Sequence, residues 1–238
     1  LFLFIIWRIN ARKYISSSTV ASAYDAWTQD KLLERLWGEH IHLGFYPSGK
    51  KNIDFRKAKV QFVHELVKWS GLDKLPKGSR ILDVGCGIGG SSRILAEYYG
   101  FNVTGITISP AQVKRARELT PYGLNCNFQV MDALDLKFED GSFDAVWSVE
   151  AGAHMNDKNR FADEMLRTLR PGGYLALADW NSRDLEAYPP SFLEKLVLKQ
   201  LLEQWVHPNF ISIIEFSNIL GTNKNSSGRV ISENWNSY

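Results

Sequence analysis

Cysteine is scarce in this sequence, because only Cys86 and Cys126 occur among its 238 residues. Two cysteines exclude a disulfide framework and favour a reducing compartment, and no Cys/His spacing resembles a zinc site, so we expect no metal. A large excess of positive or negative charge is lacking as well, and the formal net charge of +2 is too small to indicate nucleic-acid binding. The composition, 45% hydrophobic and 23% charged, is that of a globular protein.

A long hydrophobic run is also missing. Residues 1–7, LFLFIIW, are all apolar, but a membrane-spanning helix needs about 20 such residues. Arg8, Arg12 and Lys13 follow closely. We interpret residues 1–13 as the end of a membrane anchor whose first part is missing, with its basic cluster on the cytoplasmic side. An amphipathic segment that packs on the domain is the alternative.

Short apolar runs rich in β-formers alternate with helical stretches from Arg80 onward. Strands are predicted at 81–84, 101–106, 128–130, 143–147 and 174–178, and helices at 52–70, 91–99, 110–119 and 159–169. This alternation predicts an α/β fold with a Rossmann-like, mostly parallel sheet and right-handed crossovers. Asp157 is expected to cap the last of these helices, and residues 170–173 to turn the chain into the next strand. We divide the chain into the anchor end at 1–13, a substrate-side cap segment at 14–79 and a cofactor-binding domain at 80–238.

The strongest motif is ILDVGCGIGG at 81–90, which follows a predicted strand and opens a predicted helix. Its glycines match the dinucleotide pattern G-x-G-x-x-G, a weak signal on its own. A dinucleotide site also needs an acidic residue about 20 positions later to bind the ribose, and residues 98–117 contain none. Asp83 would repel a pyrophosphate and attract an ammonium group. The motif therefore favours the cationic cofactor S-adenosylmethionine over NAD; a tight turn without a ligand is the alternative.

Further polar residues lie where strands are predicted to end, the edge at which open parallel sheets bind ligands. The hydroxyl of Thr107 can bond a ribose diol. The carboxylate of Asp132 can accept a hydrogen bond from an adenine amino group, or it can simply stabilise a turn. Ser148 and Glu150 follow the fourth predicted strand. All four positions suit the same ligand.

Three segments resemble class I S-adenosylmethionine-dependent methyltransferases of the tocopherol-pathway group: DVGCGIGGSS from Asp83, GITISP from Gly105 and WSVEAGAHM from Trp147. The segments VEAG at 149–152 and ADWN at 178–181 look closer to the cyanobacterial 2-methyl-6-phytyl-1,4-benzoquinol methyltransferases than to the γ-tocopherol enzymes. YDAW at 24–27 and WGEHIHLG at 37–44 are similar to the same group, so the resemblance covers nearly all of residues 24–210.

The resemblance implies a membrane-associated enzyme on the cytoplasmic face of a thylakoid or plasma membrane in a cyanobacterium-like cell. It also implies S-adenosyl-L-methionine as the cofactor. Together with the motif analysis, it gives this set of cofactor-binding residues: Asp83, Gly85, Cys86, Gly87, Ile88, Gly89, Gly90, Thr107, Ile108, Gln112, Asp132, Ala133, Ser148 and Val149.

The end of the chain departs from that family, whose sheet has seven strands. Residues 230–235 are predicted as a sixth strand, and no segment suits a seventh. We therefore expect a chain truncated at its C-terminus, in which the last strand or strands of the sheet are missing.

The chemistry implied by the resemblance is methyl transfer to the aromatic ring of a prenylated quinol. Glu150 and His154, four residues apart, are the predicted catalytic residues, because a base must take the phenolic proton; a cofactor contact and a structural histidine are the alternatives. His40 and His42 lack a third ligand for a metal. Asp179 and Trp180 are predicted in the pocket or the core.

The apolar face at 189–210 is expected to pack on the sheet or to line a channel for a prenyl tail. Methylation of γ-tocopherol, of another phenol or of a sterol remains the enzymatic alternative, and a cofactor-binding protein without turnover the non-enzymatic one. The sequence predicts no oligomeric state.

Overall fold

The structure, a computed structural model, describes residues 13–47, 53–226, 228–233 and 235. The predicted anchor at 1–13 therefore lies, except for Lys13, outside the described residues. Within the described part of the chain, no helix is both long and apolar enough to cross a membrane.

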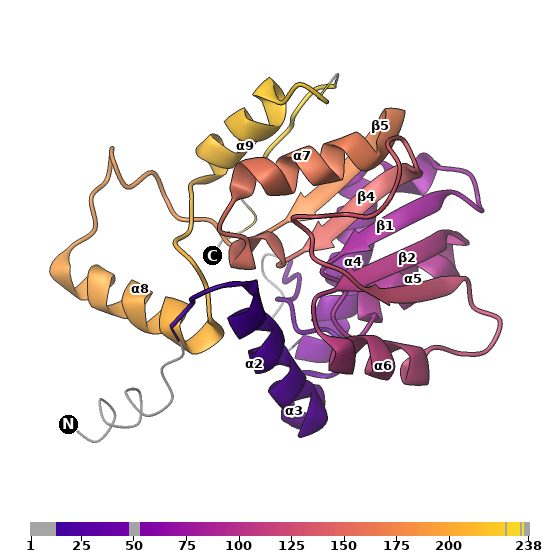
Figure 1. Ribbon diagram of the computed structural model, residues 1–238, viewed down its shortest axis with the longest axis horizontal. Helices are drawn as coiled ribbons and strands as arrows, with labels where there is room; N and C mark the ends of the chain where they lie inside the picture. The colour runs from indigo at the N-terminus through magenta and orange to yellow at the C-terminus, as the bar shows by residue number, and fades with distance from the viewer. Residues whose placement is uncertain (1–12, 48–52, 227, 234, 236–238) are drawn as a thin grey trace.

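Five parallel strands form the sheet, in the order β3-β2-β1-β4-β5 (Figure 1). They are β1 (Arg80–Val84), β2 (Asn102–Thr107), β3 (Cys126–Val130), β4 (Phe143–Val149) and β5 (Leu169–Ala178). Each contains one of the predicted strands almost entirely, so the α/β prediction is confirmed. The order reverses at β1, and this topological switch point is where open α/β sheets bind ligands.

Helices cover both faces of the sheet. On one face, α4 (Phe55–Ser70) and α5 (Gly90–Tyr99) pack on β1, β2, β4 and β5 through a core that contains Leu66, Leu95 and Trp147. On the other face, α7 (Lys158–Thr168) and α9 (Ile213–Thr222) pack through Phe161 and Phe216. The helix α6 (Pro110–Leu119) contacts β2 and β3. Successive strand side chains point to opposite faces of the sheet and both faces are covered, which explains why two separate cores form.

Local signals in the sequence explain most helix boundaries. The Asp157 carboxylate accepts a hydrogen bond from Arg160 N, as predicted for the cap of α7. The predicted turn at 170–173 is wrong, because β5 begins at Leu169 and includes these residues. Its register with β4 shifts between the pairs of Phe143 and Ala145, so the glycine-rich segment forms an irregularity within the strand.

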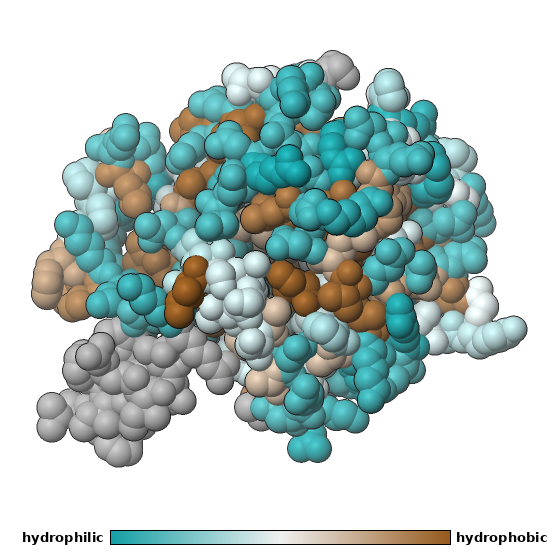
Figure 2. Space-filling model, viewed as in Figure 1, coloured by the Kyte–Doolittle hydropathy of each residue, from teal (hydrophilic) through white to brown (hydrophobic). Residues whose placement is uncertain are grey.

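Two helices precede the predicted ones: α2 (Ser17–Gln29) and α3 (Leu32–Trp37). Their sequence has no long apolar period because only Val20 and Ala23 of α2 are buried. The helix α8 (Phe192–Trp205) has no buried residue, so the expectation that it packs on the sheet is wrong. It projects from the body (Figure 1), and apolar side chains cover its free end (Figure 2), where Phe192 is 74% exposed.

Candidate active site

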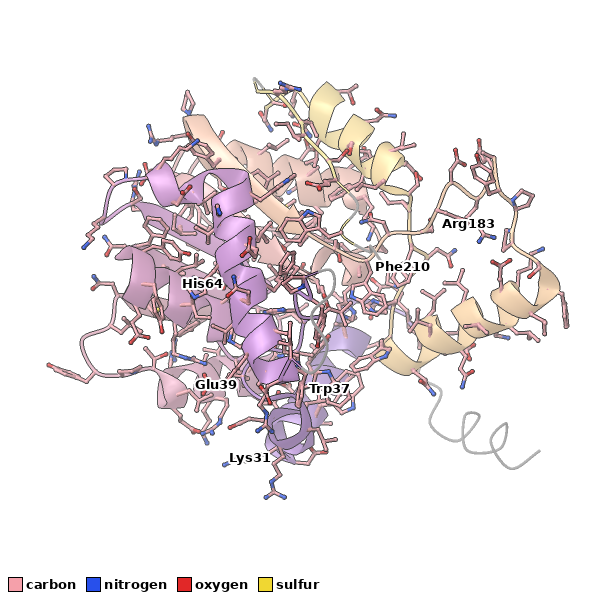
Figure 3. All side chains as sticks on the ribbon, turned by 180° about the vertical axis from the view of Figure 1, so that it is seen from behind. Lys31, Trp37, Glu39, His64, Arg183 and Phe210 are labelled. Atoms are coloured by element: carbon pink, nitrogen blue, oxygen red, sulfur yellow. The ribbon has the colours of Figure 1, made fainter. Side chains whose placement is uncertain are left out.

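A pocket of about 310 Å³ lies at the carboxyl ends of β1, β2 and β4. The glycine turn after β1 forms one side, and α2 with the loop at 37–43 forms the other. Trp37 and Glu39 of this loop lie at the foot of α4 (Figure 3). Of the predicted cofactor residues, those that line the pocket are Asp83, Gly85, Cys86, Gly87, Ile88, Gly90, Thr107, Ile108, Gln112, Asp132, Ala133 and Val149.

The glycine turn has a shape that side chains would prevent. Gly85 and Gly87 have φ angles of +79° and +55°, in the left-handed region that glycine adopts without strain. A Cβ at Gly85 would overlap the Cβ of Ala151, whereas a Cβ at Gly87 would meet only Gln112 Nε2, at 4.0 Å. The first glycine therefore lets the turn approach β4, and the second leaves open the space above the turn.

Asp83 is the last but one residue of β1, and its side chain lines the pocket. The side chain is only 2% exposed and accepts a hydrogen bond from Ser92 Oγ at 2.5 Å. Burial raises its pKa to about 7, although the Ser92 hydrogen bond lowers it. No cation pairs with Asp83 among the described residues. A buried, unpaired carboxylate that lines a pocket suits a cationic ligand.

Thr107 and Gln112 meet on the ribose side of the predicted site. Thr107 donates from its hydroxyl to Gln112 Oε1 at 2.6 Å and accepts from Ser109 N at 3.3 Å. Because the Thr107 proton is committed to Gln112, the two hydrogens of the Gln112 amide are the donors left for a ligand. Asp132 Oδ1 accepts a hydrogen bond from Leu134 N at 2.9 Å, so this oxygen stabilises the turn, which was the alternative interpretation of Asp132. The other carboxylate oxygen takes no part in that hydrogen bond.

Two predicted cofactor residues do not line the pocket. Ser148 is buried between strands, and its hydroxyl donates to Val84 O at 2.9 Å. Gly89 precedes the first turn of α5, where a Cβ would press on the Phe128 ring and on Arg93. Both residues instead serve the packing of the turn against the sheet, and their predicted contacts with the cofactor stay predictions.

Glu150 reaches the pocket from the end of β4 in a strained backbone conformation, with φ at +52°. It is therefore not part of a helical turn with His154, although both residues line the pocket. Glu150 Oε1 accepts a hydrogen bond from Leu43 N at 2.8 Å, which fastens the loop at 37–43. Burial raises the pKa of Glu150, opposed by hydrogen bonds from Trp180 and Leu43 and by the charge of Lys59.

His154 forms a pair with Tyr24 of α2. Their Nε2 and hydroxyl oxygen are 2.9 Å apart, and the His207 ring stacks on His154 with 4.1 Å between centroids. Burial, and secondly His207, lowers the pKa of His154 to about 3, so the imidazole is neutral. Tyr24 and His207 were not predicted as site residues. Tyr24 lies 130 residues before His154 in the sequence and His207 lies 53 residues after it, so only the fold brings them together. The YDAW motif was the one signal for Tyr24.

Charged groups tie α2 and α3 to the cofactor half of the protein. Asp25 Oδ1 accepts from Ser109 Oγ at 2.5 Å and from Ala111 N at 3.0 Å, at the start of α6. Arg115 of α6 pairs with Glu34 of α3 at 2.6 Å. The helix that presents Tyr24 is thus bound to the helix that presents Gln112.

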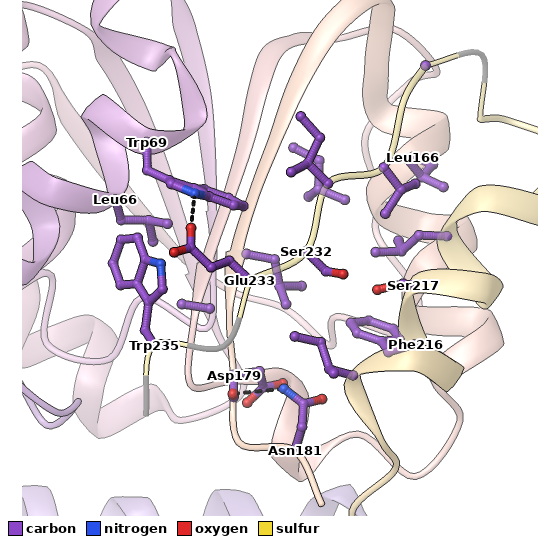
Figure 4. Close-up of a pocket in the computed structure, with 18 of the residues that line it drawn as sticks. Leu66, Trp69, Leu166, Asp179, Asn181, Phe216, Ser217, Ser232, Glu233 and Trp235 are labelled. Atoms are coloured by element: carbon purple, nitrogen blue, oxygen red, sulfur yellow. Dashed lines mark hydrogen bonds between the residues drawn. The ribbon is translucent and has the colours of Figure 1, made fainter. Parts of the chain in front are cut away.

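A second pocket, of about 1210 Å³, lies along the outer edge of β5 (Figure 4). Trp69 donates to Glu233 at 2.7 Å across it. The predicted sixth strand is wrong for the described residues, since 230–233 and 235 pair with no strand and β5 pairs only with β4. Asp179 lines only this second pocket, and its burial raises its pKa to about 7, whereas Trp180 lines both pockets.

The described residues hold no cluster of three or more His, Cys, Asp or Glu placed for a metal ion. Both cysteines are free thiols, Cys86 buried in the glycine turn and Cys126 half-buried in β3.

The pocket and its sheet match known proteins. The family model described as "Methyltransferase domain" matches residues 82–177. Over 230 residues the chain is 56% identical to the 2-methyl-6-phytyl-1,4-hydroquinone methyltransferase of Synechocystis sp. (strain ATCC 27184 / PCC 6803 / Kazusa), an alignment that covers 97% of this chain and 72% of that protein. The chain belongs to the class I S-adenosylmethionine-dependent methyltransferases. The resemblance inferred from the motifs is thereby confirmed.

Two further relatives of this methyltransferase are informative. The chloroplastic tocopherol O-methyltransferase of Arabidopsis thaliana is 38% identical over 201 residues, which are 79% of this chain and 58% of that protein. The crystal structure of geranyl diphosphate C-methyltransferase from Streptomyces coelicolor A3(2), with S-adenosyl-L-homocysteine bound, has a TM-score of 0.68 at 22% identity. That match covers 87% of this chain and 78% of the other, and it confirms the fold.

The pocket residues of this methyltransferase fit its cofactor. S-adenosylmethionine supplies an electrophilic methyl group on a positively charged sulfur. With the cofactor bound, the Asp83 carboxylate would hold its ammonium group, the Gln112 amide would donate to ribose oxygens and Asp132 would accept from adenine, while Gly87 leaves room beside them. Cysteine and aliphatic side chains at Cys86, Ile108 and Ala133 complete an apolar lining.

The Thr107–Gln112 pair gives a testable prediction for cofactor binding. Gln112→Ala removes the free amide donors, and we expect S-adenosylhomocysteine to bind about 1–1.5 kcal/mol more weakly, which is the range for one neutral hydrogen bond. Thr107→Val leaves those donors in place and should cost less. Calorimetry on both variants checks this order, and an unchanged dissociation constant for Gln112→Ala would assign the ribose to another residue.

Proposed function

We propose that this methyltransferase transfers a methyl group to a ring carbon of a prenylated 1,4-quinol of the 2-methyl-6-phytyl type. The observation that carries the proposal is the 56% identity to a 2-methyl-6-phytyl-1,4-hydroquinone methyltransferase over nearly the whole chain. The lining of the pocket also suits a quinol, because aromatic residues that can pack on a flat ring lie beside polar groups that can bond ring hydroxyls.

The aromatic residues come from three elements that meet at the pocket. Tyr24 belongs to α2, Trp37 to α3 and Trp205 to the end of α8. The Trp205 ring packs edge-on against Trp37, with centroids 6.4 Å apart. Between them, Glu150 and the Tyr24–His154 pair offer partners for ring hydroxyls. These are the groups that would bind the quinol and orient its carbon toward the methyl donor, and alignment alone can lower a barrier by roughly 7–11 kcal/mol.

The direct test uses the full-length protein with labelled S-adenosylmethionine and four acceptors: 2-methyl-6-phytyl-1,4-benzoquinol, γ-tocopherol, a sterol and a simple phenol. We expect label in the first acceptor, on carbon, identified by mass and fragmentation. Because a tocopherol O-methyltransferase is also 38% identical, preferential labelling of γ-tocopherol would contradict the quinol assignment. Binding of S-adenosylhomocysteine without turnover of any acceptor would favour a binding protein instead.

We also propose that the enzyme works at a membrane surface, because a prenylated quinol has almost no free concentration in water. The exposed apolar side chains of α8, including Leu193 at 71% and Val197 at 66%, support this. Full-length protein should sediment with membranes and resist a high-salt wash, since apolar burial is not screened by salt. Deleting residues 1–13 should release it without changing cofactor affinity, and should harm turnover of a long-tailed quinol more than that of a short-tailed one. Wild-type protein found wholly in the soluble fraction would refute the membrane proposal.

A further inference from the structure

Two histidines outside the predicted catalytic pair line the same pocket. His40 and His42 belong to the loop at 37–43, and their rings are 5.1 Å apart between centroids. His40 Nδ1 and His42 Nε2 are 3.1 Å apart, and His42 Nδ1 is 2.7 Å from Leu43 O. The His40 ring lies against Gly90, where a side chain on the glycine would displace it.

These contacts fix where the hydrogens lie. A carbonyl oxygen only accepts, so His42 Nδ1 must carry the hydrogen that it shares with Leu43 O. Burial lowers the pKa of His42 to about 4 and, with the charges of His42, Arg93 and Lys59, lowers that of His40 to about 3. Both rings are therefore neutral, and His42 Nε2 is an acceptor. His40 Nδ1 must then be the donor, which leaves its Nε2 with a free lone pair.

That lone pair is available to a ligand, whereas the predicted catalytic residues already have partners in the protein. Among the described residues, nothing forms a hydrogen bond to His40 Nε2, and the atom is not buried out of reach. His154 Nε2, in contrast, is paired with Tyr24, and Glu150 Oε1 is occupied by Leu43 N. The open acceptor nitrogen of the pocket thus belongs to His40.

The backbone that carries His40 is held firmly. Lys59 of α4, 4% exposed, donates from Nζ to His40 O at 2.7 Å and to Trp37 O at 3.1 Å. Its ammonium also lies 5.7 Å from the Trp37 ring centroid. On the other side of the loop, Arg93 of α5 pairs with Glu39. The charged groups that face His40 are thus Lys59 from α4 and Arg93 from α5, with Glu39 neutralising Arg93.

We propose that His40 Nε2 accepts the proton of the ring hydroxyl next to the methylated carbon, and that His42 is a positioning residue which holds His40 in the required tautomer. The inference rests on the proposed quinol substrate. It names a proton acceptor other than the predicted catalytic residues, and it leaves Glu150 and the Tyr24–His154 pair to hold the ring.

The step balances as follows. The ring carbon forms a bond to the methyl carbon, the methyl–sulfur bond breaks, and its electron pair stays on sulfur. The hydroxyl proton moves to His40 Nε2, and the ring oxygen becomes a carbonyl. The methylated carbon then loses its hydrogen as a proton to water, and His40 Nε2 returns its proton to the ring oxygen, so one proton is released overall and His40 is neutral again.

A weak base is sufficient for this transfer. The hydroxyl of a quinol is a poor acid, with a pKa of about 10, but it becomes as acidic as a protonated ketone while the carbon–carbon bond forms. The acceptor must be neutral and placed at the oxygen at that moment, and a charged imidazolium could not serve. Burial, together with the nearby charges of Arg93 and Lys59, lowers the pKa of His40 and keeps it neutral throughout the physiological range.

The test compares His40→Gln and His40→Asn with His42→Gln, and with His64→Gln as a control, because His64 of α4 pairs with Tyr99 away from the pocket. We expect both His40 variants to bind S-adenosylhomocysteine as wild type does and to lose about 10²-fold in kcat on the prenylated quinol near pH 7. His42→Gln should lose less, and His64→Gln should lose nothing.

The decisive measurement is the pH profile. As the pH approaches 10 the quinol ionises on its own, so the deficit of the His40 variants should shrink to less than tenfold. A deficit that is constant with pH, wild-type kcat in a His40 variant, or loss of cofactor binding in both His40 variants would each overturn the proposal. Those results require an active wild-type enzyme. If the wild type methylates no quinol, the proposed function fails, and this inference fails with it.

Discussion

Gly85→Ala is expected to abolish cofactor binding and to destabilise the protein strongly. A Cβ there would overlap the Cβ of Ala151, two residues beyond the end of β4, while φ at +79° is unfavourable for any side chain. The left-handed conformation costs about 1–2 kcal/mol, and forcing extra volume into a packed site costs about 1–3 kcal/mol more. Urea unfolding should show a loss of roughly 2–5 kcal/mol, and calorimetry should detect no S-adenosylhomocysteine binding.

Gly78→Ala is the matched control, because Gly78 has a similar φ of +85° and a Cβ there would meet nothing within 4 Å. This variant should show only the conformational cost of about 1–2 kcal/mol and should bind the cofactor normally. If both variants lose the same stability and both bind, the close approach of the glycine turn to β4 is not what shapes the pocket.

Asp83→Asn is expected to have the largest effect on affinity among variants that keep the fold. The change keeps the shape and the Ser92 contact but removes the charge that suits the cofactor's ammonium group. Hydrogen bonds to charged groups contribute about 1.5–3 kcal/mol, so S-adenosylhomocysteine should bind roughly 10- to 150-fold more weakly. Asp140→Asn is the control, because Asp140 is 81% exposed and pairs with Arg167. Wild-type affinity in Asp83→Asn, measured by calorimetry, would place the ammonium elsewhere.

The same carboxylate predicts a pH dependence. Because burial raises the pKa of Asp83 to about 7 in the free protein, the group is ionised above pH 7 and becomes neutral below it. Only the ionised form attracts an ammonium group. Affinity for S-adenosylhomocysteine should therefore be constant above pH 8 and fall as the pH drops from 7 to 5, whereas Asp83→Asn should show a flat profile over the same range. Parallel profiles for the two proteins would contradict this assignment.

The strands and the helices between them were predictable because each buries a regular face. Strands such as β1, four of whose five residues are buried, read as short apolar runs, and the amphipathic α7 reads as a helix. The helix α2 was missed because it buries two residues only. The helix α8 was found from its apolar residues, but periodicity does not tell which surface an apolar face meets. Here most of this face is exposed, while Trp205 at the end of the helix packs against Trp27 and Trp37.

The cofactor side of the site was largely predictable, since the glycine turn and the strand ends lie close together in the sequence. Ser148 was predicted as a cofactor contact from its place near the strand end, but alternate residues of β4 point to opposite faces, and its hydroxyl bonds the neighbouring strand. The substrate side could not be predicted in the same way. Tyr24, His154 and His207 come from three distant segments, and only the fold brings them to one pocket, where Tyr24 pairs with His154 and the His207 ring stacks on it.

The contacts of Asp25 couple the binding of the cofactor to the binding of the quinol. Asp25 joins the start of α6, which carries Gln112, to α2, which carries Tyr24. Anything that stabilises one helix in place stabilises the other, so the two ligands are thermodynamically linked. By reciprocity, the factor by which the cofactor tightens quinol binding equals the factor by which the quinol tightens cofactor binding. Asp25→Asn should weaken this link. The fold-increase in quinol affinity caused by the cofactor and the fold-increase in cofactor affinity caused by the quinol should then both fall towards one, by the same amount.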